Sequence, residues 1–122
     1  MTVTAKRLII EERRRQLAEE GYTREHDRQQ GWQPLAQAAQ SYGCNFPDDW
    51  PDAWATQTSK PKGVLRNLVR SGALYVAAIE AAAAMGEYYE ADALCAPLAD
   101  VVGRLDLLLD EVRVVLMEDG EL

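Results

Sequence analysis

The residues that could do chemistry are concentrated between positions 11 and 27, in the stretch EERRRQLAEEGYTREHD. This stretch contains His26, the only histidine of the chain, and it is interrupted by Gly21. Glycine enters the left-handed backbone region without steric cost, so Gly21 predicts an abrupt end to the preceding helix. Such a turn can fold the charges of residues 24–27 back toward those of the helix and build a polar pocket.

In such a pocket, arginine offers a planar fork for phosphate or carboxylate groups, and an imidazole or phenol ring offers a flat face for a base. Three consecutive arginines point in different directions on a helix, so at most two of them can face a shared site. The predicted binding residues are Glu12, Arg13, Arg15, Gln16, Glu20, Tyr22, His26 and Asp27.

A structural interpretation of the same cluster stays open. Four of its residues could form an internal salt-bridge network that fixes the turn at Gly21: Glu12, Arg15, Glu20 and His26. Substitution distinguishes the two alternatives, because removing one partner of a buried ion pair destabilises the fold. Removing a binding side chain would instead abolish activity and leave the melting temperature nearly unchanged.

Nucleophilic catalysis and zinc binding receive little support from the sequence. A catalytic serine or cysteine needs a neighbouring base, and no sequence context pairs His26 with Ser41 or Cys44. One histidine and two separated cysteines do not make a tetrahedral zinc site. We therefore predict no catalytic residue, no metal and no cofactor.

Magnesium-dependent nucleotide hydrolysis is a more serious alternative. All-α NTP pyrophosphohydrolases place paired Glu-x-x-Glu and Glu-x-x-Asp carboxylates on two helices, because Mg²⁺ takes oxygen ligands and bridges phosphates. Glu87-x-x-Glu90 matches half of this pattern, but Asp106-x-x-x-Asp110 has the wrong spacing for the other half. An enzyme of this class is kept as an alternative.

Length and charge limit the class of protein. A chain of 122 residues, 48% of them hydrophobic, predicts a single domain over 1–122. The formal charge of −7 argues against direct nucleic-acid binding and against an anionic membrane surface. Residues 87–122 carry ten acids and two arginines, so we interpret them as an acidic extension of a 1–86 core.

The cysteines and the N-terminal segment predict a cytoplasmic location. Cys44 and Cys95 lie far apart and form no Cys-x-x-Cys motif, which favours reduced thiols. Only three apolar residues separate Arg7 from Glu11, too few for a secretory signal. No apolar run approaches the ~20 residues that span a bilayer.

Hydrophobic periodicity predicts an all-α bundle of four or five helices. The first helix, over 4–20, has a thin apolar stripe, so it must bury polar side chains or stay half exposed. A second helix has Pro34 in its first turn and Gly43 just past its end. Its packed face consists of Leu35, Ala38, Ala39 and Tyr42.

The central helix is predicted over 62–85, between a Pro/Trp-containing loop at 44–62 and the stop signal of Gly86. Gly72 lies inside this helix, where glycine costs about 1 kcal/mol relative to alanine, so we expect it to permit a close helix crossing.

A last helix has Pro97 in its first turn, and the apolar residues after Pro97 alternate in steps of four and three, which is typical of a heptad seam. This seam predicts a homodimer with two-fold symmetry, although packing on the second helix is an alternative. The predicted interface residues are Leu98, Val102, Leu105, Leu109, Val112 and Leu116.

A family resemblance emerges from the front half of the chain. The motifs that carry it are Glu12-Arg13-x-x-Gln16, Glu20-Gly21-Tyr22-Thr23, Glu25-His26-Asp27 and Leu35-x-x-Ala38-Ala39-x-x-Tyr42, followed by Trp50-Pro51 and Arg66 to Leu74. With these motifs, residues 8–80 resemble a family of small, largely uncharacterised phage and prophage proteins. That family commonly has a second acid and a basic residue where this chain has Ala78 and Ala81, and only Glu80 is kept.

The resemblance implies a phage-encoded protein that acts in the cytoplasm of a bacterial host. We expect a non-enzymatic accessory protein that binds and neutralises a host defence or regulatory protein, as an anti-defence inhibitor. The acidic C-terminal helices would then mimic nucleic-acid charge. The alternatives are sequestration of a nucleotide-like host signalling molecule and the pyrophosphohydrolase-like enzyme.

Overall fold

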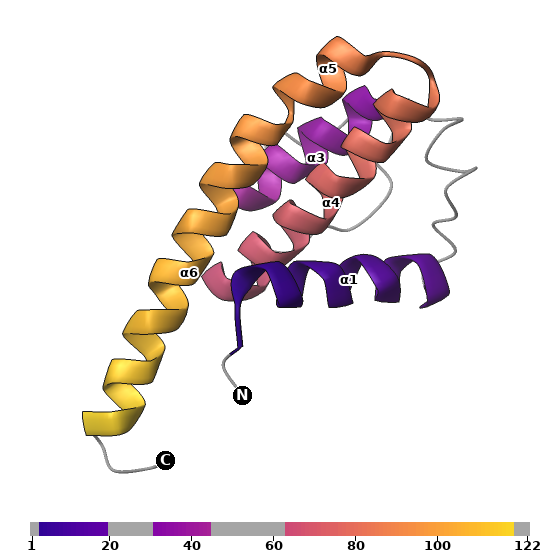
Figure 1. Cartoon of the computed structure of the whole chain (residues 1–122). Coiled ribbons are helices and arrows are strands. Elements are labelled where there is room, and N and C mark those ends of the chain that lie inside the picture. The colour runs from indigo at the N-terminus through magenta and orange to yellow at the C-terminus, as the bar shows by residue number, and fades with distance from the viewer. Residues whose placement is uncertain (1–2, 20–30, 45–62, 119–122) are drawn as a thin grey trace.

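The computed structural model describes residues 3–19, 31–44 and 63–118, and every regular element in these ranges is an α-helix. The helices are α1 (Ala5–Glu19), α3 (Trp32–Cys44), α4 (Val64–Ala84), α5 (Tyr88–Ala93) and α6 (Cys95–Glu118). Helices α3 and α6 both run alongside α4, and α1 lies transverse to α4 and contacts α4 and α6 (Figure 1). The predicted all-α bundle is confirmed, whereas Gly21 and residues 45–62 lie outside the described ranges.

Helix α4 is the centre of the core, because all four other helices pack against it. Its most extensive contact is with α3, and the buried residues of both helices are mostly small, so the two backbones can approach closely. The buried small residues of the two helices are Ala38, Ala39, Ser41, Gly43, Ser71, Gly72, Ala73, Ala77, Ala78, Ala81 and Ala82. On the predicted packed face of α3, Leu35, Ala38 and Ala39 are buried and Tyr42 is half-buried.

Gly43 lies inside α3, so the prediction that it follows the end of the helix is wrong. A Cβ atom at Gly43 would lie 3.0 Å from the hydroxyl oxygen of Ser71 on α4. That hydroxyl donates a hydrogen bond of 2.6 Å to the carbonyl oxygen of Ala39. The glycine therefore serves the close approach of α3 to α4.

Gly72 is the crossing point of α1 over α4, as its position in the sequence predicted. A Cβ atom at Gly72 would lie only 2.6 Å from Cγ1 of Ile9, well inside van der Waals contact. Ile9 is 3% exposed, so its side chain fills the space that the missing Cβ leaves.

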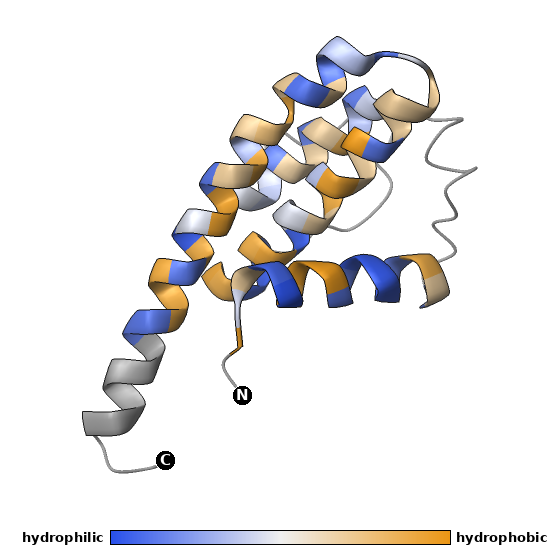
Figure 2. Cartoon of the chain, viewed as in Figure 1, coloured by the Kyte–Doolittle hydropathy of each residue, from blue (hydrophilic) through white to orange (hydrophobic). Residues whose placement is uncertain are grey.

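The buried face of α1 changes from apolar to polar residues along the helix. Its buried residues follow each other at steps of four, four and three: Ala5, Ile9, Arg13 and Gln16. Figure 2 shows a short hydrophobic stretch of α1 between two hydrophilic ones. The thin apolar stripe thus results in buried polar side chains, whereas Ile10 is 50% exposed.

Helix α6 supplies side chains to the ends of two other helices. The carboxylate of Asp106 accepts a 3.0 Å hydrogen bond from the backbone N–H of Ala5, at the start of α1. The guanidinium of Arg104 donates a 3.0 Å hydrogen bond to the carbonyl of Gly43, near the end of α3. Each charge complements the partial charge of the helix end that it contacts.

A Schellman motif ends α4. Gly86 has a φ of 78°, and its N–H donates to the carbonyl of Ala83 at 3.0 Å. The N–H of Glu87 donates to the carbonyl of Ala82 at 2.8 Å. Both bonds satisfy carbonyls in the last turn of α4, so the predicted stop at Gly86 is confirmed and α5 begins directly after it.

The seam of α6 packs within the chain where its side chains are described. Leu105 is 0% exposed, which corrects its assignment to a dimer interface, because this side chain is already covered by the chain's own core. Leu98, Val102 and Leu109 are half-buried against the same core. The side chains of Val112 and Leu116 lie outside the description, and the homodimer stays a prediction.

Among the described helices, none is sufficiently long and apolar to cross a bilayer.

The crossing at Gly72 generates a matched pair of substitutions. Gly72→Ala forces overpacking against Ile9, which costs about 1–3 kcal/mol, whereas the gain in helix propensity is about 1 kcal/mol, so we expect a net loss of up to about 2 kcal/mol. Gly103→Ala is the control, since a Cβ at this exposed position of α6 would meet no atom within 4 Å. It should raise the free energy of unfolding by about 0.5–1 kcal/mol. Urea unfolding measures both, and a stabilising Gly72→Ala would contradict the close crossing.

Candidate functional site

The described part of the charged cluster is anchored by an ion pair between α1 and α4. Nε of Arg13 lies 3.4 Å from Oε1 of Glu80, and the arginine side chain is 7% exposed against 33% for the glutamate. Arg13 follows Ile9 by one helical turn, so the crossing at Gly72 directs it toward α4. Gln16, the next buried residue of the stripe, is 5% exposed.

A second ion pair lies within α1. Nε of Arg15 is 3.0 and 3.1 Å from the two carboxylate oxygens of Glu12, and a terminal guanidinium nitrogen also contacts this carboxylate. The same guanidinium lies 3.7 Å from Glu19. Arg15 is therefore held on the surface of its own helix, at 31% side-chain exposure.

The structure thus divides the eight predicted binding residues. It pairs Glu12 with Arg15, places Arg13 against Glu80 of α4, and buries Gln16. The other four lie in the stretch 20–30, outside the described residues: Glu20, Tyr22, His26 and Asp27. Both arginines predicted to hold an anion already contact carboxylates of the chain, which is what the structural interpretation expects of Glu12 and Arg15.

Glu80 was not among the predicted binding residues, although it contacts Arg13 across 67 positions of sequence. The resemblance singled it out only as the acid that this chain keeps near the end of its third helix. Ala78 and Ala81, which stand where the resemblance leads us to expect an acid and a base, are 0% and 3% exposed and belong to the core.

Two of the four carboxylates considered for magnesium, Glu87 and Asp106, have other partners. Oε2 of Glu87 accepts a 2.5 Å hydrogen bond from the indole N–H of Trp32, which ties α3 to the α4–α5 turn. Asp106 caps α1 through Ala5. Across the described side chains, no three His, Cys, Asp or Glu residues are grouped to hold a metal ion.

An exposed aromatic patch at the α4–α5 turn consists of Met85, Tyr88 and Tyr89. These side chains are 50%, 70% and 83% exposed, respectively. The analysis of the sequence missed this patch; the available signal was the adjacent tyrosines two residues after a glycine stop, in an acidic stretch. Tyrosine and methionine are enriched at protein interfaces, so the patch is a candidate contact surface.

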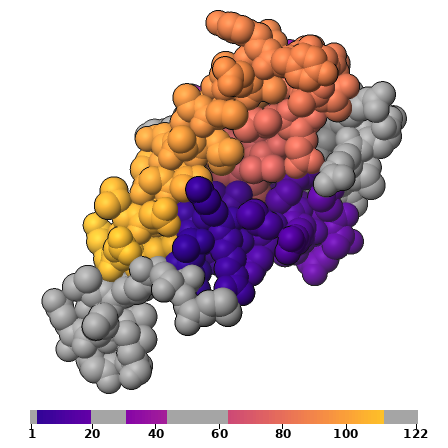
Figure 3. All heavy atoms as spheres, viewed as in Figure 1, coloured from indigo at the N-terminus to yellow at the C-terminus, as the bar shows by residue number. Residues whose placement is uncertain are grey.

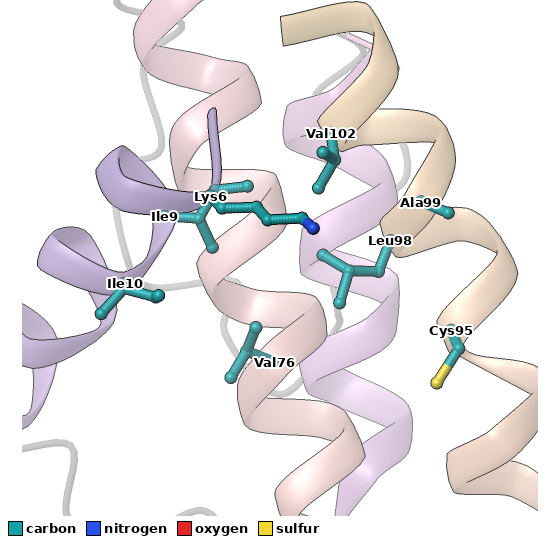
Figure 4. A pocket seen from close by; sticks show the side chains of 8 residues that line it. All are labelled: Lys6, Ile9, Ile10, Val76, Cys95, Leu98, Ala99 and Val102. Carbon is teal, nitrogen blue, oxygen red and sulfur yellow. The ribbon is translucent and has the colours of Figure 1, made fainter. Parts of the chain in front are cut away.

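A groove of about 410 Å³ lies between α1, α4 and α6. All three helices reach the face of the molecule shown in Figure 3. Figure 4 shows Lys6 of α1 extending across the groove toward α6. Cys95 lies farther along α6, away from the tip of Lys6. The lining residues are Lys6, Ile9, Ile10, Val76, Cys95, Leu98, Ala99 and Val102. Seven of these eight side chains carry no charge.

Comparison of the chain with protein-family models, with curated proteins and with solved structures finds no match.

The two ion pairs of α1 are expected to differ in their contribution to stability. Arg13→Ala leaves the partly buried carboxylate of Glu80 without this partner and should lower the free energy of unfolding by about 3 kcal/mol. Arg15→Ala breaks a pair between neighbours on one helix and should cost less than about 1 kcal/mol. Chemical denaturation measures both.

Arg14→Ala is the matched control for these substitutions, because Arg14 is the exposed arginine between them. It should change the free energy of unfolding by less than about 0.5 kcal/mol. If Arg13→Ala is no more destabilising than Arg14→Ala, the ion pair with Glu80 does not hold α1 on α4.

Proposed function

We propose that this chain is a non-enzymatic binding protein that covers a basic surface of a partner protein. The observation that carries the proposal is the aromatic patch of Met85, Tyr88 and Tyr89, which stands exposed within an acidic stretch of the chain. Large apolar side chains are costly to leave in water unless a partner covers them, and three of them flank a single turn.

The rings of the patch are suited to act as anchors. Tyrosine gives a large contact area with few rotatable bonds, and tyrosines are enriched among the residues that contribute most to binding. The Schellman motif at Gly86 and the hydrogen bond between Trp32 and Glu87 fix the turn that carries them. A partner would therefore meet a surface that is ordered before binding, which lowers the entropic cost of association.

The charge around the patch selects the kind of partner. Residues 87–110 contain six acids and one arginine, Arg104. Glu90 is half-buried and Asp92 and Asp100 are exposed on α5 and α6. Such a surface attracts a basic partner and speeds its association at low ionic strength.

The resemblance to phage and prophage proteins supports a host target in the bacterial cytoplasm. A defence or regulatory protein that contacts nucleic acid presents the basic surface that the acidic helices fit. Occupation of that surface would neutralise the target by occlusion, without any chemical step.

The two other functions receive less support from the described residues. A nucleotide-like ligand needs cations that are available to its phosphates, whereas Arg13 and Arg15 both contact carboxylates of the chain. A pyrophosphohydrolase needs carboxylates that are available to Mg²⁺, whereas Glu87 and Asp106 accept hydrogen bonds from Trp32 and Ala5.

Capture from bacterial lysate tests the proposal when the intact chain is compared with Tyr88→Ala/Tyr89→Ala. The double variant should retain the specific partner at least about tenfold more weakly, since losing anchors worth about 2 kcal/mol or more exceeds the 1.4 kcal/mol of a tenfold change. Its melting temperature should stay unchanged, because both rings are exposed. Val64→Ala is the control: Val64 is 52% exposed at the opposite end of α4.

The captured partner should be basic, and raised salt should elute it. Equal capture by the intact chain and the double variant would place the contact surface elsewhere. A partner whose retention is insensitive to salt would contradict the electrostatic part of the proposal.

A further inference from the structure

The groove between α1, α4 and α6 combines an apolar lining with a single cation. We propose that it is a binding site for a small amphiphile that carries an alkyl chain and one carboxylate. The volume of about 410 Å³ falls within the range of about 300–1,000 Å³ that is usual for ligand sites. This inference concerns a surface separate from the aromatic patch and does not depend on the proposed function.

The walls of the groove suit an alkyl chain. Ile10 of α1 is 50% exposed, and Val76, Leu98 and Val102 are half-buried, so apolar surface remains in contact with water. An alkyl chain lying between α1 and α6 would cover these side chains. Removing such surface from water is favourable in proportion to its area and needs no directional contact.

Lys6 supplies the charge complementarity. It is the only charged residue among the described side chains of the lining, and it extends across the groove toward Leu98 and Val102 (Figure 4). Among the described residues, no carboxylate lies within ion-pair distance of Lys6. A lysine ammonium is a compact charge with three donors, and a carboxylate next to apolar surface can accept from it.

The acid that follows the groove along α6 has a contact of its own with the start of α1. Asp106 follows Val102 by one helical turn, but its carboxylate accepts the N–H of Ala5 at the positive end of α1. The groove therefore presents a cation on a protein whose overall formal charge is −7. This local sign favours an anionic head group over a cationic or neutral one.

Cys95 gives a direct readout of occupancy, because it is exposed and lines the groove. Sodium decanoate, below its micelle-forming concentration, should slow the alkylation of Cys95 by iodoacetamide in a saturable way. Peptide mass spectrometry reads this cysteine separately from Cys44. Decanol tests the alkyl chain without the charge, and butyrate tests the charge without a long chain; both should protect Cys95 more weakly than decanoate.

Two variants isolate the ammonium group. Lys6→Met keeps an unbranched apolar side chain and should weaken decanoate binding about tenfold, as expected for a lost charge-assisted hydrogen bond, while decanol protection stays unchanged. Arg7→Met is the matched control, since Arg7 is the adjacent cation and pairs with Glu11 outside the groove. It should bind decanoate like the intact chain, and thermal melting should show both variants folded.

Three results would overturn the proposal. In the first, decanoate leaves the alkylation rate of Cys95 unchanged. In the second, Lys6→Met and Arg7→Met weaken decanoate protection equally, which would remove the role of Lys6. In the third, Cys95 becomes protected in the absence of decanoate as protein concentration rises, which would make a second copy of the chain the occupant of the groove.

Discussion

The close crossing of α1 over α4 is the constraint on which two features of α1 depend: its ion pair with Glu80 and its wall of the groove. Ile9 occupies the space beside Gly72 that any larger residue would fill, so this contact fixes where α1 crosses α4. From this fixed point, Arg13 lies one turn toward the end of α1 and meets Glu80. Lys6 lies one turn toward its start and extends into the groove. A shift of α1 would change the polar contact and the groove together.

Charged side chains connect helices of this chain at three places. Arg13 joins α1 to α4, Arg104 caps α3, and Asp106 caps α1. These contacts explain how a helix with a thin apolar stripe can pack in a bundle whose core is rich in alanine. Alanine allows close approach of the backbones but buries little area for each residue, and polar contacts between helices then specify which ends meet.

The helices were predictable because their signals are local. Periodicity located α3 and α4, and the glycines at 72 and 86 indicated a crossing and a stop, since both roles follow from the absence of a side chain. Gly43 shows the limit of such predictions. Glycine is favoured both at a helix end and where two helices approach closely, so the residue type does not distinguish the two roles. Three other features depend on how the helices cross, and the spacing of residues along one helix carries no information about that crossing. These features are the pair between Arg13 and Glu80, the burial of Leu105, and the groove.

The uneven stripe of α1 has a consequence for motion. Only Ala5 and Ile9 contribute buried apolar side chains from this helix. Separating α1 from the other helices should therefore expose less apolar surface than separating α3 from α4. Such an opening would dismantle one wall of the groove and expose the carboxylate of Glu80 at the same moment. A ligand bound in the groove would stabilise the closed position of α1. It would then slow amide hydrogen exchange throughout α1 and leave the exchange of α3 unchanged.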